Sequence, residues 1–475
     1  MSIKIRKITA LFMSLVCAAA VTACGSSDNT SSDVEIVYEY ITQSGSSVAS
    51  GDSSGTDNSG SSAGGGSTSS GTQQGGNAGN SGGNSGSSGG VDPSKYKGTT
   101  VRYATWKDPQ LNEDGDAVNS FEEKYGIKVQ IDMVEQDDYI NLVTAMIAAD
   151  DSPDIVFCTG TFPSILSLCQ PIDVAQIDKS DPFWDQSMFE LSKVNGKSYL
   201  LNAVGNIWNE VDCLLYNKAL LKKANCYTPE EYAAQGKWTW DALEQIMTAV
   251  DKLGTKYVGG AFEVVSLLAS AGCTVYSYKD GKFYNGMNSM MTDATRRIAT
   301  WFNDGIANKN TYDFRVGNAG ITIVNAFGLK KTGFFFDSNW SDFGCYYIPD
   351  YDENHKAVPC GIFRGWGIAK GAKNPVAAGI FLKHYLDVDN YDISDAFINK
   401  EAERFFFELT TGNSDDKLFY FNDAQDEVIT DLDTSIFFHE IPNQAPGQVA
   451  ASLSAQKNAV DNAVKKLNDY LSRIK

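Results

Sequence analysis

The chain has 475 residues, of which 42% are hydrophobic, and its formal net charge is −20 at pH 7 because acids outnumber Lys and Arg by 59 to 39. This charge argues against nucleic-acid binding, which draws its affinity from cations that neutralise phosphates, and against adsorption to an anionic lipid surface. It fits a protein with neutral or cationic ligands.

Residues 1–23 have the layout of a secretory signal peptide. Three basic residues precede an apolar stretch over 8–21, which is too short to span a bilayer, and small residues then lead to Cys24. This ending resembles the lipobox of bacterial lipoproteins. In that family the matching cysteine, here Cys24, receives a diacylglycerol and becomes the mature N-terminus. The alternative is an ordinary secreted protein with a coincidental cysteine.

Residues 24–95 are predicted to form a disordered tether behind that anchor. Glycine and serine make up most of 41–90, and almost no apolar surface offsets the entropy of the chain. A flexible chain of this length has a root-mean-square reach of roughly 45 Å. One segment, 34–41, alternates enough to be a short transient strand or a docking segment, and chance is an equal alternative. The sequence therefore predicts a globular domain held at the extracellular face of the cell membrane.

The globular part opens with alternating strands and helices. Apolar periodicity predicts strands at 99–106, 127–134 and 154–157, with helices over 114–126 and 137–150 between them. Links this short imply right-handed crossovers and a parallel sheet.

Ligands of such sheets bind at the carboxyl ends of the strands. Those ends carry the first candidate binding residues, which are Trp106, Asp108, Glu135 and Thr161. Farther along, helices are predicted over 239–253, with Thr239 as N-cap and Gly254 as the stop, and near 455–474.

Cysteine and histidine usage gives no sign of a metal site. Beyond Cys24, seven cysteines remain, an odd number without any Cys-x-x-Cys spacing, and we expect most of them to be free and buried. The three histidines are far apart in sequence. The stretch from Asp350 to Asn354 begins like a calcium loop, but its sixth and twelfth positions are His355 and Gly361 instead of Gly and Glu. We therefore predict no metal and no cofactor.

Catalytic motifs are equally weak. The Gly-x-Ser-x-Gly match at 79–83 lies inside the predicted tether, where it follows no strand and enters no helix. The phosphate-binding Gly-rich loop motif does not occur. We predict no catalytic residue, although paired carboxylates of a glycan hydrolase could hide among 59 acids.

Four segments resemble, in order, those of the family 1 extracellular solute-binding proteins of ABC transporters, the maltodextrin-binding-protein-like group. They are ADDSPDIV at 149–156, DCLLYNKALLKKA at 212–224, WTWDAL at 238–243 and FRGWGIAKGAKNPVAAGIFL at 363–382. The resemblance covers about 97–390. Residues 333–340 read GFFFDSNW and depart from the family, which often has a Gly-x-Trp sequence here, whereas Ser338 stands two positions before Trp340. This departure affects the expected shape of one side of the pocket.

The resemblance implies an α/β chain with the two-lobed type II fold of periplasmic binding proteins. Each lobe would be a mixed, mostly parallel sheet flanked by helices, with hinge strands between lobes that close around a ligand. We expect lobe 1 to comprise 96–205 and 363–430, and lobe 2 to comprise 206–362 and 431–475.

The implied function is capture of a carbohydrate, an oligosaccharide, for delivery to an ABC permease by a lipid-anchored monomer that is no enzyme. Sugars need flat aromatic faces and hydrogen-bonding side chains. The crossings and loops add further candidates, which are Asn206, Trp208, Asp337, Trp340, Arg364 and Trp366. Three other tryptophans, Trp184, Trp238 and Trp301, are expected to pack instead.

Other functions remain open on the same fold. The chain could bind a peptide, a polyamine or another non-sugar solute, or present its ligand to a sensor kinase. A cleft lined by several unpartnered carboxylates would favour a cation. A surface glycan hydrolase and an adhesin are the remaining alternatives.

Overall fold

The computed structural model describes residues 91–106, 109, 113–159, 161–206, 211–331, 342–362, 364–391, 393, 396–411, 418–420, 428 and 432–474. The chain divides into two compact units, 1–83 and 84–475, and the description below concerns the second. The predicted lipidation site Cys24, most of the predicted tether and the predicted strand at 34–41 lie outside the described residues.

The first sheet grows from the predicted alternation of strands and helices. Its parallel strands are β1 (Thr100–Thr105), β2 (Lys128–Met133) and β3 (Ile155–Thr159), in the order β2-β1-β3. They are connected by α1 (Glu113–Tyr125) and α2 (Tyr139–Ala148). Gly126 follows α1 with a φ of +65°, the left-handed conformation that lets a helix end there. The predicted parallel sheet is confirmed.

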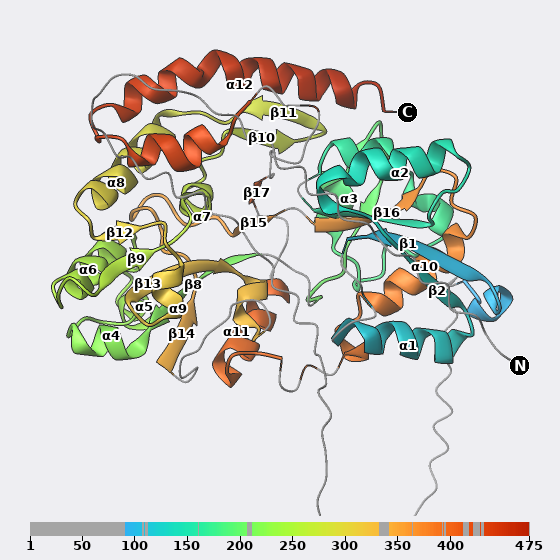
Figure 1. Ribbon diagram of the computed structural model, residues 1–475, viewed down its shortest axis with the longest axis horizontal. Coiled ribbons are helices and arrows are strands. Elements are labelled where there is room, and N and C mark those ends of the chain that lie inside the picture. The colour runs from blue at the N-terminus through green and yellow to red at the C-terminus, as the bar shows by residue number, and fades with distance from the viewer. Residues whose placement is uncertain are drawn as a thin grey trace, which may run out of the picture. The chain divides into compact units, whose positions relative to one another are not determined.

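Later segments complete this sheet. Antiparallel to β3 runs β16 (Arg364–Ala369), which also pairs with β4 (Cys169–Gln170) and β7 (Leu200–Leu201). Alternate β1 residues face opposite sides: Val101 and Tyr103 pack with α1 and α10 (Pro375–Tyr385), whereas Ala104 packs with α2. Figure 1 shows α1 and α10 on one side of β1 and β16, and α2 and α3 (Gln186–Leu191) on the other.

The second sheet has the strand order β12-β9-β13-β8-β14. Its strands are β8 (Asp212–Asn217), β9 (Val258–Ala261), β12 (Ala307–Asn308), β13 (Ala319–Asn325) and β14 (Phe343–Tyr346). The strands β12, β9 and β13 are parallel, while β8 runs antiparallel to β13 and β14. The sheet is mixed, as predicted, but it is not mostly parallel, because two of its four strand pairings are antiparallel.

Helices cover both faces of the second sheet. Leu214 and Tyr216 of β8 pack with α4 (Lys218–Lys223) and α6 (Trp240–Asp251), whereas Cys213 and Leu215 face the opposite cluster. The remaining helices of this half are α5 (Pro229–Ala234), α7 (Val264–Ser270), α8 (Ser289–Asn303) and α9 (Tyr312–Arg315). The short strand pairs are β5 (Lys193–Val194) with β6 (Lys197–Ser198), β10 (Tyr276–Lys279) with β11 (Lys282–Asn285), and β15 (Cys360–Ile362) with β17 (Leu418–Tyr420).

Two predicted helix boundaries shift in the structure. The helix predicted over 239–253 ends earlier, at Asp251, and the Thr239 side chain makes no capping hydrogen bond. The C-terminal helix α12 spans Val449–Leu471 and so begins before the predicted 455, because the buried Val449 and Leu453 extend its apolar stripe by more than a turn.

The two sheets are linked by adjacent crossing segments. The chain leaves the first sheet after β7 and enters the second at Asp212, and it returns through β15 to Arg364. Val211 of the first crossing pairs with Gly361 of the second. Asn202 fixes the same region, since its Nδ2 donates to the Arg364 carbonyl oxygen at 3.2 Å.

Helix α11 (Lys400–Thr411) corrects a predicted lobe boundary. We expected 363–430 to belong to lobe 1, but α11 packs against β14 of the second sheet. Its Phe405, Phe406 and Leu409 join the apolar cluster that contains Phe343. The boundary was wrong because the apolar face of α11 matches the uncovered face of the second sheet, a tertiary match that residues 391–440 do not reveal in sequence.

The long helix α12 touches both halves of the unit. It packs against β11 and α8 and lies above the β10–β11 hairpin in Figure 1. Its last turns also reach the first half, because the Tyr470 hydroxyl donates to the Ser164 carbonyl oxygen at 3.0 Å and the Asn195 side chain donates to the Ile474 carbonyl oxygen at 2.8 Å.

Buried side chains confirm the packing predictions. Trp184, Trp238 and Trp301 are all buried. None of the seven described cysteines forms a disulfide bond, and all but Cys226 are buried. Burial raises the pKa of Cys273 to about 12, so this thiol stays protonated and inert. Within the described part of the chain, no helix has the length and apolar character needed to cross a membrane.

His384 on α10 makes stability depend on pH. Its side chain is 4% exposed, and its Nε2 lies 2.9 Å from Ser120 Oγ on α1. Burial, with a smaller effect of Lys124, lowers its pKa from 6.5 to about 4. Between pH 6.5 and about pH 4, this histidine is protonated in the unfolded chain but stays neutral in the folded chain. The free energy of unfolding therefore falls as the pH is lowered through this range.

We expect this histidine to cost the protein about 1–2 kcal/mol of unfolding free energy between pH 6.5 and pH 4, allowing for partial solvent screening. In urea titrations across this range, His384→Gln should lose that much less stability than the wild type. Parallel pH profiles for the two proteins would show that His384 titrates normally in the fold.

Candidate functional site

The first sheet gathers four predicted binding residues at one edge. Trp106 directly follows β1, Glu135 follows β2, and Thr161 follows β3. Arg364 opens the antiparallel β16 and pairs in register with Thr159 at the end of β3. Because carboxyl ends of parallel strands meet at one edge, the four residues share that edge.

Trp106 is a firmly supported, partly exposed ring at this edge. It lies edge-on to Tyr139 and tilted against Phe157, with both centroid distances at 5.0 Å. Tyr139 is itself fixed, because its hydroxyl donates to the Ala104 carbonyl oxygen at 2.8 Å and accepts from the Phe157 amide at 2.9 Å. The indole is therefore held rigidly enough to serve as a stacking platform.

The other three residues at this edge differ in exposure. Glu135 is exposed, whereas Arg364 is only 7% exposed and its guanidinium lies over the Phe157 ring at 5.3 Å from the centroid. Thr161 is buried, and its hydroxyl lies 3.7 Å from Cys158 Sγ. A ligand at this edge would meet Trp106 and Glu135 first, with Arg364 and Thr161 beneath them.

Two predicted site residues lie in the interior instead. Trp366 is 1% exposed, its ring centroid lies 5.0 Å from that of Phe157, and its Nε1 donates to the Tyr103 hydroxyl at 2.9 Å. Asn206 is also buried and donates to the Asn202 side chain and to the Ala203 carbonyl oxygen. Burial argues against ligand contact for both: Trp366 fills the core, and Asn206 braces the first crossing.

The remaining predicted contacts cannot be placed. Asp108, Trp208, Asp337 and Trp340 lie outside the described residues. They stay predictions.

The second sheet presents a matching edge that sequence reasoning missed. Strand directions bring to this edge the end of β12, the end of β9, the end of β13, the start of β8 and the end of β14. The residues at or just beyond these ends are, in that order, Lys309, Glu263, Asn325, Asp212 and Tyr346. The rule that ligands bind at the carboxyl ends of parallel strands applies here too. It could not be used on the sequence, because β12 has two residues and β9 reads Val-Gly-Gly-Ala, so neither pattern predicts a strand.

A cavity of about 410 Å³ opens at the β8–β14 end of this edge. Asp212, Trp238, Tyr346, Tyr347 and Cys360 are among its lining residues. The indole Nε1 of Trp238 donates to the Tyr347 carbonyl oxygen at 2.9 Å, and the Cys360 thiol lies 3.6 Å from an Asp212 carboxylate oxygen. The cavity thus combines aromatic walls with a buried carboxylate, the mixture that polar organic ligands need.

Charges of both signs line the two edges. Among the described residues they include the carboxylates of Glu135, Asp212 and Glu263 and the cations Lys309 and Arg364. Burial raises the pKa of Glu263 and lowers that of Lys309, as expected of groups partly withdrawn from water. No three His, Cys, Asp or Glu side chains of the described segments come together as a metal site requires.

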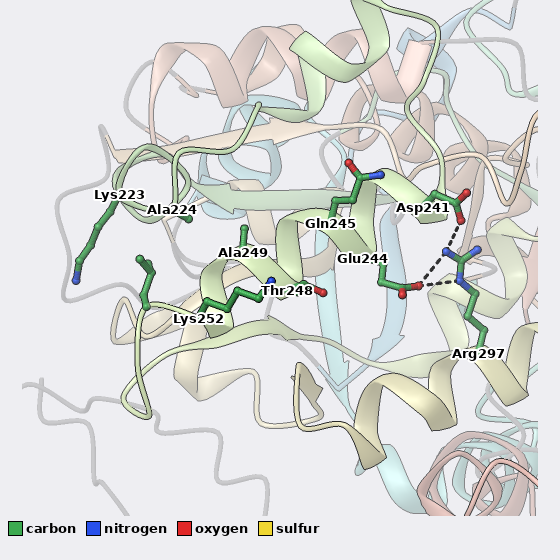
Figure 2. A pocket seen from close by; sticks show the side chains of 10 residues that line it. Lys223, Ala224, Asp241, Glu244, Gln245, Thr248, Ala249, Lys252 and Arg297 are labelled. Carbon is green, nitrogen blue, oxygen red and sulfur yellow. Dashed lines mark hydrogen bonds and ion pairs between the residues drawn. The ribbon is translucent and has the colours of Figure 1, made fainter.

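A second cavity, of about 630 Å³, lies elsewhere (Figure 2). It follows one face of α6, with Lys223 and Lys252 toward one end and Arg297 at the other. Arg297 is fully engaged there, because it bonds Asp241 and, at 3.0 Å, Glu244. This cavity follows a helix face instead of the strand ends, so we do not assign the ligand to it.

The fold is shared with solved solute-binding proteins. An ABC substrate-binding protein from Listeria monocytogenes, solved with cycloalternan, is 15% identical with a TM-score of 0.52 over 79% of this chain and 98% of its own. An extracellular solute-binding protein from Staphylococcus aureus, solved with maltose, is 15% identical with a TM-score of 0.55 over 79% and 98%. A cyclic α-maltosyl-1,6-maltose binding protein from Arthrobacter globiformis is 13% identical with a TM-score of 0.55 over 78% and 99%.

Sequence comparison defines the family directly. No curated protein sequence matches the chain. A sequence profile for bacterial extracellular solute-binding proteins, however, matches residues 116–393, which is more than half of the chain and contains both strand-end edges except for Trp106. The match agrees with the two sheets, the two crossing segments that pair with each other and the polar residues at the strand ends described above. The chain belongs to the bacterial extracellular solute-binding protein family.

Proposed function

We propose that this protein captures a neutral carbohydrate, an oligosaccharide, between the carboxyl edges of its two sheets. The observation that carries the proposal is the chemistry of those edges. Trp106 offers an aromatic ring on a rigid support, and carboxylates, an ammonium and a guanidinium lie at the same edge or at the carboxyl edge of the second sheet. Sugars combine apolar C–H faces with hydroxyls that both donate and accept, so they match this mixture.

The presence of both positive and negative side chains at the two sheet edges favours a neutral sugar over a polyamine as the ligand. A polyamine site would need carboxylates in excess and no cation close by, whereas Lys309 and Arg364 accompany the three carboxylates here. The solved proteins that share the fold support the same direction, since two of them are described as holding maltose or cycloalternan. A peptide or a sensor partner has no comparable support.

We further propose that the protein works at the extracellular face of the membrane. Cys24 carries the lipid, the tether comprises residues 24–95, and an ABC permease receives the loaded protein. The chain acts as a monomer and binds its ligand without converting it, so prolonged incubation returns the oligosaccharide unchanged. The candidate contacts are Trp106, Asp108, Glu135, Thr161, Trp208, Asp337, Trp340 and Arg364 from the first analysis, with Asp212, Glu263 and Lys309 added by the second edge.

Thermal unfolding of the full-length protein tests the carbohydrate proposal. The panel comprises maltose, maltotriose and cycloalternan, with amino acids and the polyamine spermidine as controls. A ligand at 100 times its Kd should add about 2.7 kcal/mol of stability and raise Tm by several degrees. A shift with spermidine or an amino acid alone would keep the family and overturn the sugar. If no compound of the panel raised Tm, the ligand would be another solute.

A further inference from the structure

Glu263 and Lys309 come together at the carboxyl edge of the second sheet. Strands β9 and β12 are parallel neighbours, and Asn308 pairs in register with Ala261. The pairing continues past the strand ends, because the Phe262 amide donates to the Asn308 carbonyl oxygen at 3.1 Å. Continued in this register, Lys309 lies opposite Phe262, and Glu263 follows one residue later. The charge of each side chain influences the other, which places both groups in one part of this edge.

The carboxylate of Glu263 is partly buried and accepts no hydrogen bond from the described part of the chain. No described residue gives it a hydrogen bond or forms an ion pair with it, and the side chains of His439 and Lys309 act on its charge only through space. A carboxylate withdrawn from water without a donor is costly, so proteins seldom keep one unless it serves a purpose. Its two oxygens can each accept hydrogen bonds from a bound molecule.

Lys309 has donors to spare. Its ammonium gives one hydrogen bond, at 2.7 Å, to the His439 carbonyl oxygen, which fixes the position of the head group. An ammonium has three N–H donors, so the others remain for a ligand. The pair thus places an acceptor and a donor at the same edge, where ligands of such sheets bind.

We propose that Glu263 and Lys309 together hold two adjacent hydroxyls of a neutral sugar unit, one donating to the carboxylate and the other accepting from the ammonium. This assignment rests on the carbohydrate function proposed above and adds to it two contacts and a selection rule. The carboxylate repels uronic acids and other anions, while the ammonium repels amino sugars and other cations. Only an uncharged unit with both hydroxyls free satisfies the two groups at once.

Isothermal titration of the full-length protein with maltose, and with maltotriose and cycloalternan in parallel, tests the pair. Glu263→Gln keeps the shape of the side chain but removes the charge and turns one acceptor into a donor. We expect Kd to rise about ten- to hundredfold, and Lys309→Gln to act in the same direction. The matched control is Asp304→Asn, an exposed carboxylate next to the opposite end of β12, which should leave Kd unchanged within about twofold.

A second measurement, urea unfolding without sugar, separates a binding role from a structural one. Glu263→Gln should be at least as stable as the wild type, because no protein donor is lost. Wild-type sugar affinity in Glu263→Gln would overturn the pair while leaving the carbohydrate function standing. If the wild type binds no sugar, the proposed function fails, and the unfolding measurement then tests the pair. A clear loss of stability in Glu263→Gln would mean that Glu263 stabilises the fold, and it would overturn the proposed pair. Equal or greater stability would support a carboxylate that is kept for a ligand.

Discussion

Gly259→Ala is expected to destabilise the protein by about 3 kcal/mol or more, and it can abolish folding of the second sheet. A Cβ at this position would penetrate the backbone of α6, since its nearest atoms are the carbonyl oxygen, Cα and carbonyl carbon of Met247. Backbone atoms cannot rotate away as a flexible side chain can. Helix and strand would have to separate, and the buried contacts of Met247 and its neighbours would be lost.

Urea unfolding followed by circular dichroism measures this effect. Gly447→Ala is the matched control, because a Cβ there meets no atom within 4 Å and the φ of Gly447 lies outside the left-handed region. The control should stay within about 0.5 kcal/mol of the wild type. Equal stabilities of the two variants would mean that α6 does not lie directly on β9. Since β9 ends just before Glu263, that result would also contradict the position of Glu263 at the carboxyl edge of the second sheet.

Trp366→Ala is expected to cost about 3–5 kcal/mol of unfolding free energy, the usual price of removing a buried tryptophan from a core. The indole is 1% exposed, contacts Phe157 and Tyr385, and donates to the Tyr103 hydroxyl. Its removal leaves a cavity between β16 and α10 that the rigid sheet cannot close. Urea unfolding gives the magnitude directly.

Trp366→Phe separates the packing role from the ligand contact predicted from sequence. Phenylalanine keeps most of the apolar contacts but removes the donor to Tyr103, so the expected loss of stability is about 1–2 kcal/mol. Sugar affinity should remain within twofold of the wild type, because the ring has no exposed face. A large loss of affinity with unchanged stability would restore Trp366 to the binding site.

The first sheet was predictable because its signals are local. Alternating apolar residues at 99–106 and 127–134, with short links between them, are enough to specify parallel strands and therefore the edge that carries Trp106 and Glu135. The second edge was not predictable in the same way. Val258–Ala261 contains two glycines that are needed for close helix packing, not for strand propensity, and Ala307–Asn308 is a strand only because β9 lies beside it.

Sequence alone determined the family and the parallel strands of the first half. It also determined that Trp184, Trp238 and Trp301 are buried and that the described cysteines form no disulfide bonds. These depend on composition, on periodicity and on short segments that resemble those of the family, all of which can be read from a linear chain. Only the tertiary structure decided which half α11 joins, that Trp366 faces the core, and that Glu263 and Lys309 become neighbours. Each of these depends on which face of an element is covered and on strand order, and residues distant in sequence set both.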